Sequence, residues 1–242
     1  MSSGIYAASA GLLARTQQLD LAANNLANVN TSGFRGERVS FQTRVMNASP
    51  EVASRAVNSF GVLGMTHTDF SQGPLLSTGN PLDVAMEGAG FFTVQTPNGV
   101  QYTRNGSFHL SSSGALVTQE GYSVLGDNGA PIILPSGKVE ISSAGVISVD
   151  GAVASQLGLA DLDADVPLTA LGNAYFSAPS AAAKAATAAS VRQGSLESSN
   201  VSPIAGATGL IEIQRNAEMM QRALTVLHNE FNRIAAEDLP KV

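Results

Sequence analysis

The stretch from Ala23 to Arg35 reads Ala-Asn-Asn-Leu-Ala-Asn-Val-Asn-Thr-Ser-Gly-Phe-Arg. Asparagines crowd its first half, and short polar residues and a glycine follow from Asn30 to Gly33. Short polar side chains compete for the backbone hydrogen bonds of a helix, and glycine accepts left-handed dihedral angles. The stretch therefore predicts the abrupt end of a helix and a turn into a different kind of structure.

Before this stretch, large aliphatic residues recur every seven positions, at Ile5, Leu12, Leu19 and Leu26. The positions that flank them are small or polar, so a helix here would offer only a narrow apolar stripe. A helix of this kind draws most of its stability from packing rather than from intrinsic propensity. The pattern therefore predicts a partner helix elsewhere in the chain.

The C-terminal region carries two heptad series that lie three residues apart. They are Leu210, Ala217, Leu224 and Phe231, and Ile213, Met220, Leu227 and Ile234. Such a stripe usually packs inside its own domain, but a matched series at each end of the chain favours a coiled coil between the terminal helices. Because conformational entropy opposes ordering these helices alone, we expect neighbouring subunits to complete their order.

The middle of the chain is punctuated by turns. Between residues 98 and 151, a residue pair ending in glycine recurs every six to eight positions. Pairs such as Asn-Gly form tight hairpin turns because both central residues accept positive φ, so the β-prone runs between them predict an antiparallel β-domain. The expected runs are Phe91–Thr96, Gln101–Arg104, Ser107–Leu110, Leu116–Thr118, Tyr122–Leu125, Ile132–Leu134, Val139–Ile141 and Val146–Val149, with returning strands at Leu157–Leu162 and Ala174–Ser177.

These patterns predict an α+β fold: an antiparallel β-rich central domain flanked by N- and C-terminal helices that pair as a coiled coil, with an extended connecting arm. The expected parts are a helix and turn over 1–33, the arm over 34–76, the β-domain over 77–177, a linker with a return strand over 178–201, and the second helix over 202–242. The Ala-rich segment 178–190 is compatible with a loop or a short helix. Gly206 and Gly209 weaken a helix start at Ser202-Pro203, so we expect the second helix to begin near Thr208.

The chain is poor in charge. Charged residues make up 13% of its 242 positions, about half the usual share, which suits a protein packed against copies or partners. The net charge of -6 and the absence of a basic run argue against nucleic-acid partners. With no cysteine, the chain has no disulfide and no thiolate metal site.

Export signals of the usual kind are missing from the sequence. No run of 18 apolar residues occurs, so direct membrane insertion is not expected. Ala8-Ser9-Ala10 resembles a cleavage site, but the charged and apolar regions of a secretory signal do not precede it. We therefore expect that any export leaves the N-terminus uncleaved.

Candidate chemical residues are few. The histidines His67, His109 and His228 lack the spacing of metal ligands, and Gly88-Ala89-Gly90 lacks the third glycine and the following helix of a phosphate loop. Asp83 and Glu87 have no base or oxyanion donor near them in the sequence. We therefore expect no catalytic, cofactor-binding or metal-binding residue, no cofactor and no enzymatic activity.

The opening stretch resembles the N-terminal signature of the flagellar axial proteins, which are the basal-body rod and hook proteins. Three further segments resemble landmarks of that family in the same order: Thr78–Gly90 with Phe91 and Phe92, Tyr102–Phe108, and Gln193–Val201. The best fit is the proximal rod type, and the distal rod type is second. After Val201 the chain departs from the family, because Ser202–Gly206 intervenes before the helix, which leaves the register of the terminal pair open by about one turn.

The resemblance implies a structural subunit of the flagellar basal-body rod, located in the periplasm-spanning rod and carried there by the flagellar type III export apparatus. It implies assembly with other rod and hook-type axial proteins and with copies of the chain itself. The expected assembly residues are Ile5, Leu12, Leu19, Asn24, Asn25, Leu26, Asn28, Gly33, Leu210, Ile213, Ala217, Met220, Leu224, Leu227, Phe231 and Ile234. The alternative is a secreted β-rich adhesin or carbohydrate-binding module whose helical termini form oligomers.

Overall fold

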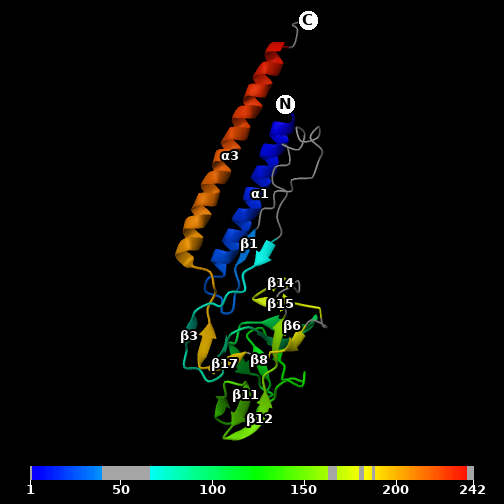
Figure 1. Ribbon diagram of the computed structural model, residues 1–242, viewed down its shortest axis with the longest axis vertical. Coiled ribbons are helices and arrows are strands. Elements are labelled where there is room, and N and C mark those ends of the chain that lie inside the picture. The colour runs from blue at the N-terminus through cyan, green and yellow to red at the C-terminus, as the bar shows by residue number, and fades with distance from the viewer. Residues whose placement is uncertain (1, 40–65, 163–167, 180–182, 187–188, 239–242) are drawn as a thin grey trace, which may run out of the picture. The chain divides into compact units, whose positions relative to one another are not determined.

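The computed structural model describes residues 2–39, 66–162, 168–179, 183–186 and 189–238, which hold two helices and 18 strands (Figure 1). The chain divides into two compact units. One comprises residues 1–27, 36–69 and 201–242 and is called the helical unit below. The other comprises residues 28–35 and 70–200 and is called the β unit. The expected mixture of two terminal helices with mostly antiparallel strands is confirmed.

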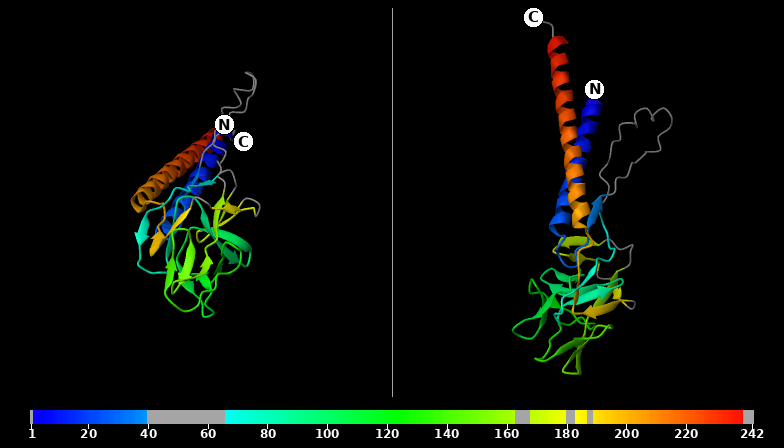
Figure 2. Two further views of the ribbon diagram at one scale, coloured as in Figure 1. Left: turned by 60° about the horizontal axis from the view of Figure 1, so that its bottom comes forward. Right: turned by 90° about the vertical axis from the view of Figure 1, so that its left-hand side faces the viewer.

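Two long helices make up most of the helical unit: α1 (Ser2–Ala27) and α3 (Pro203–Asp238). They lie side by side and run in opposite directions (Figures 1 and 2). A Cβ atom on Gly11 would lie 2.7 Å from Cε of Met220, and one on Gly206 would lie 3.5 Å from Cδ1 of Leu26. At Gly11 there is thus no room for a larger side chain without a shift of Met220.

The same unit contains a short antiparallel pair, β1 (Glu37–Val39) and β2 (Thr66–Thr68). An ion pair joins exposed Arg38 to half-buried Asp69 beside it, with 2.9 Å between Nη2 and Oδ2. The expected connecting arm over 34–76 falls largely on residues 40–65, which lie outside the described residues.

The start of α3 corrects the sequence-based expectation. The helix begins at Pro203, not near Thr208. The carbonyl of Ser202 accepts a hydrogen bond from the Gly206 amide (2.8 Å), and proline at the first helical position needs no partner for an N–H group. Gly206 lies within the first turn of the helix, so its low helix propensity does not prevent the helix from starting at Pro203.

The β unit is built on a nine-stranded antiparallel sheet with the order β14-β15-β6-β5-β9-β8-β7, to which β13 and β16 add through β5. Its strands are β5 (Phe91–Thr96), β6 (Gly99–Thr103), β7 (Phe108–Leu110), β8 (Leu116–Thr118), β9 (Ser123–Val124), β13 (Leu159–Leu162), β14 (Thr169–Gly172), β15 (Tyr175–Ser177) and β16 (Ala183–Ala185). Strands that follow each other in the sequence mostly pair with each other, as the regularly spaced turns predicted.

Three smaller sheets complete the β unit. One has the order β10 (Val139–Ile141), β11 (Val146–Val149), β12 (Ala152–Gln156). The others pair β4 (Val84–Glu87) with β17 (Ser190–Gln193), and β3 (Leu75–Ser77) with β18 (Ser195–Glu197). The chain thus returns after residue 189 to pair with strands more than 100 residues earlier.

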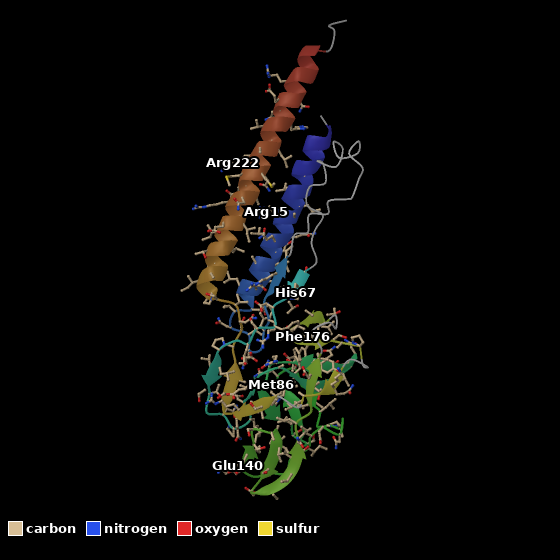
Figure 3. The ribbon with its side chains drawn as sticks, in the orientation of Figure 1. Arg15, His67, Met86, Glu140, Phe176 and Arg222 are labelled. Atoms are coloured by element: carbon tan, nitrogen blue, oxygen red, sulfur yellow. The ribbon has the colours of Figure 1, made fainter. Side chains whose placement is uncertain are left out.

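Two apolar clusters form the core of this unit. Phe92 and Phe108 meet edge to face in the larger cluster, with 5.3 Å between ring centroids, and Met86 is fully buried there. In the smaller cluster Phe91 packs against Phe176 with 5.7 Å between ring centroids. Met86 and Phe176, one from each cluster, are labelled in Figure 3. Aromatic pairs of this geometry add to the stability gained from burial alone.

Four predicted runs match strands exactly, namely β5, β8, β10 and β11. The run Ile132–Leu134 is wrong, because its neighbourhood forms only isolated bridges such as that between Leu125 and Pro131. Proline has no amide hydrogen to continue a ladder. The Ala-rich segment is neither loop nor helix at residues 183–185, because β16 pairs with β13 and this tertiary pairing overrides the helix propensity of alanine.

Candidate assembly site

The stripe of α1 predicted from heptads coincides with its less exposed face. Half-buried or buried positions recur as pairs every three or four residues: 11 and 12, 14 and 15, 18 and 19, 21 and 22, and 25 and 26. Leu12, Leu19 and Leu26 all belong to this face, and Ala14 is buried with 7% of its surface exposed. The side chain of Ile5 lies outside the described residues.

On α3 the predicted seam follows a single face. From residue 210 to 226 the half-buried positions are Leu210, Ile213, Ala217, Met220 and Leu224, and every position between them is exposed. The side chains of Leu227, Phe231 and Ile234 lie outside the described residues. The helical unit therefore buries one narrow stripe of α3 and leaves most of this helix facing solvent.

Asn25 of the opening stretch fastens the end of α1 to the strand that follows. Its carboxamide nitrogen donates to the carbonyl of Glu37 (2.7 Å), and its carboxamide oxygen accepts from the Glu37 amide (2.9 Å). Only a side chain with both a donor and an acceptor can make this pair of bonds, which explains asparagine at this position.

Asn25→Asp should lower the free energy of unfolding of the helical unit by about 1–3 kcal/mol, because the carboxylate cannot donate to the Glu37 carbonyl. Thermal unfolding followed by far-ultraviolet circular dichroism measures this loss. Gln17→Glu is the control, since it adds the same charge at an exposed position of α1. Equal melting temperatures for the two variants would contradict the assigned role of Asn25.

Gly33 turns the chain within the β unit. Its φ is +71°, and a Cβ atom there would lie 2.4 Å from the backbone of Arg104 and Asn105. Its amide donates to the carbonyl of Glu197 (2.8 Å). Glycine is therefore required at this position both by the left-handed backbone and by the close approach of another segment.

Two residues beyond Gly33, a buried ion cluster begins. Nη2 of Arg35 lies 2.7 Å from Oε1 of Glu197, and Nη1 of Arg104 lies 3.3 Å from Oε2 of the same carboxylate. The exposed fractions are 2% for Arg35, 5% for Arg104 and 0% for Glu197. Charges are this deeply buried only when they are paired and hydrogen-bonded.

Backbone groups complete the cluster. The amide of Gly73 donates to Oε1 of Glu197 (2.9 Å), and Nη2 of Arg104 donates to the carbonyl of Gly88 (2.7 Å). The guanidinium of Arg104 also lies 5.3 Å from the ring centroid of Phe91, within the range of a cation–π contact. Four segments far apart in the sequence thus meet at one carboxylate.

The cluster holds two cations and one anion. Burial lowers the pKa of the Arg104 guanidinium, and the Glu197 carboxylate opposes that shift. Three buried nitrogens, Nε and Nη1 of Arg35 and Nε of Arg104, have no hydrogen-bond partner within the described part of the chain. Among the described residues, Glu197 is the one carboxylate that forms ion pairs with both arginines.

The cluster gives the sequence landmarks a physical meaning. Arg35 comes from the opening stretch, Gly88 from the second landmark, Arg104 from the third and Glu197 from the fourth. Sequence reasoning missed these residues as a set. The available signal was that each of the four landmarks carries a charged residue in a chain where only 13% of residues are charged.

The other residues considered from the sequence do not converge. Asp83 is buried, and its Oδ1 accepts a hydrogen bond from Nδ2 of Asn80 (3.0 Å). Oε1 of Glu87 instead lies 3.5 Å from Nη1 of Arg192. His67 stands exposed on β2 (Figure 3), and His109 and His228 are exposed too. Among the residues with described positions, no three His, Cys, Asp or Glu side chains group in a way that could hold a metal ion. Neither described helix is apolar enough over sufficient length to span a membrane.

The chain thus combines a β unit, whose sequence landmarks meet in one buried cluster, with two long terminal helices. Family models agree along the chain: residues 5–35 match the flagella basal body rod protein, 85–149 the flagellar hook protein FlgE/F/G D1 domain, and 192–235 the flagellar basal body rod FlgEFG protein C-terminal model. The chain belongs to the flagellar basal-body rod protein family.

Similar proteins cover nearly the whole chain. The flagellar basal-body rod protein FlgF of Caulobacter vibrioides is 34% identical over 100% of both chains. FlgF of Mesorhizobium japonicum is 33% identical over 90% of each chain. The flagellar basal-body rod protein FlgG of Bacillus subtilis is 31% identical over 93% of this chain and 95% of its own.

Proposed function

We propose that this chain is a structural subunit of the flagellar basal-body rod, of the proximal, FlgF-like type, and that it is not an enzyme. The observation that carries the proposal is the similarity to FlgF proteins over the full length of both chains. The distal, FlgG-like type is the alternative, because FlgG proteins are similar over almost the same length.

Assembly is proposed to proceed through the terminal helical segments, 1–33 and 202–242. In the sequence, the connector 34–76 precedes the β-domain over 77–177, and the linker 178–201 follows it. Besides its half-buried stripe, α3 carries a second row of large apolar side chains that are exposed: Ile204, Ile211, Met219 and Val226. Rows of this kind on a soluble chain are typical of protein–protein contacts. The row supports packing against helices of neighbouring rod and hook-type axial subunits or of further copies.

In this mechanism the helices pair as coiled coils, and contacts between unlike surfaces that do not close into a ring extend the subunits into a helical tube. The subunit would reach the periplasm-spanning rod through the flagellar export apparatus, without a cleaved signal peptide. The low charge of the chain supports a surface largely covered by partners.

Basal bodies isolated from cells that carry a tagged copy of the chain test this proposal. Electron microscopy should place the tag in the rod, and deletion of the gene should abolish both complete rods and motility. The position of the tag along the rod separates the proximal from the distal type. Complete rods in the deletion strain would overturn the proposal.

A further inference from the structure

A hollow of about 260 Å³ opens on the β unit beside the turn between β14 and β15. Its walls come from four places: the β5–β6 turn, β6, Tyr122 before β9, and the β14–β15 turn. Its size is close to the lower end of the range for ligand pockets, about 300 Å³. Neither the ion cluster nor the terminal helices contribute to it.

The side chain of Gln101 lines this hollow and is only 7% exposed. Its carboxamide makes no hydrogen bond to any residue that the structure describes, although it has two donors and an acceptor. Its polar atoms are reached by solvent, since the buried side-chain atoms without a partner belong to arginines elsewhere in the described chain. Gln101 therefore presents unused hydrogen-bonding groups to the interior of the hollow.

Two tyrosines form the aromatic part of the wall. Tyr175 is buried, and its hydroxyl donates to Oε2 of Glu120 at 2.6 Å. Burial and this hydrogen bond raise the pKa of Tyr175 above its ordinary value, so the hydroxyl remains protonated. The half-exposed ring of Tyr122 packs edge to face on Tyr175 with 5.9 Å between ring centroids.

The turn that closes the hollow has an unusual backbone. Asn173 and Ala174 both have positive φ, 49° and 61°, where a two-residue hairpin turn favours glycine at the second position. The carbonyl of buried Ala174 accepts from Oγ1 of Thr103 (2.9 Å), which holds the turn in place. Strained residues that the surrounding structure fixes in this way gather at binding sites.

We propose that this hollow binds a neutral saccharide. None of the described residues that line it is charged, so a phosphate or carboxylate ligand would lose its water without gaining a cation from them. Sugar hydroxyls both donate and accept, which matches the carboxamides of Asn98, Gln101 and Asn173. The half-exposed ring of Tyr122, which also lines the hollow, supplies an apolar group on which the C–H face of a sugar ring could pack.

Titration of the full-length protein with a trimer of N-acetylglucosamine and, separately, with maltotriose tests the proposal by NMR. Backbone resonances of Gln101 and Tyr122 should shift with at least one sugar. Gln101→Met keeps the volume of the side chain but removes its carboxamide, and should weaken binding about tenfold or more, equivalent to at least one lost hydrogen-bonding group. Tyr122→Leu should weaken it similarly, whereas Gln156→Met, the same chemical change on exposed β12, should leave it unchanged.

The two sugars identify the class of glycan, and the variants test the proposed site. A preference for the N-acetylated trimer would assign the site to an acetamido glycan, and a preference for maltotriose to a plain glucan. Gln101→Met should melt at the same or a higher temperature, because the fold loses an amide that has no protein partner. Failure of both sugars to bind at millimolar concentration would overturn the proposal, as would unchanged binding by Gln101→Met or a lower melting temperature for it.

Discussion

Glu197→Gln is expected to lower the free energy of unfolding of the β unit by about 3–5 kcal/mol, because removal of one partner leaves buried charge without compensation. Glutamine keeps the shape of the side chain but leaves Arg35 and Arg104 as two buried cations without an anion. Its amide nitrogen would also face a guanidinium donor in place of a carboxylate oxygen. Urea unfolding followed by near-ultraviolet circular dichroism measures the effect, since Tyr102, Tyr122 and Tyr175, three of the four tyrosines, lie in the β unit.

Two variants make this experiment specific to the buried cluster. Glu140→Gln removes the same charge from Glu140 on β10 (Figure 3), whose ion pair with Lys138 is exposed, and should leave the unfolding midpoint almost unchanged. Arg104→Leu should lower the free energy of unfolding by less than Glu197→Gln does, because it leaves the Arg35 cation paired with the Glu197 anion. If Glu197→Gln and Glu140→Gln unfold at the same urea concentration, the cluster is not what holds the β unit together.

The parts of the fold that the sequence predicted well are those set by local chemistry. Turn pairs such as Asn98-Gly99 and Ala144-Gly145 have glycines with positive φ, 104° and 79°. These turns separate strands whose presence was predicted, and the ends of β5, β10 and β11 were predicted exactly. The heptad series likewise predicted which face of α3 is half buried, since helical periodicity is a property of neighbouring residues.

The parts that could not be predicted depend on distant partners. Strands β17 and β18 form because β4 and β3, more than 100 residues earlier, offer edges to pair with. The same is true of Glu197, whose sequence neighbours are serine and leucine and give no sign of two arginines. An a/d pattern is compatible with a parallel or an antiparallel helix pair, so the sequence pattern alone did not give the orientation. In the structure Gly11 lies near Met220 and Gly206 near Leu26, so the two helices are antiparallel.

Leu224→Asp is expected to abolish incorporation into the rod and, with it, motility. Leu224 lies half buried on the seam of α3, where burial of a leucine contributes about 1.5–3 kcal/mol and a charge in its place must lose water. In an assembly the penalty recurs at every subunit, so a modest loss per contact becomes a failure to polymerise. Electron microscopy of basal bodies and swimming assays in a deletion strain carrying the variant measure the outcome.

Gln221→Asp is the matched control for this variant, because it adds the same charge to an exposed position less than one turn away on α3. It should support normal rods. Both variants should keep the wild-type urea midpoint of the β unit, which does not contain α3, and immunoblots of exported protein separate failed assembly from failed export. Normal rods built from Leu224→Asp would show that the seam of α3 is not an assembly surface, whereas loss of rods in both variants would show that any new charge on this helix is harmful.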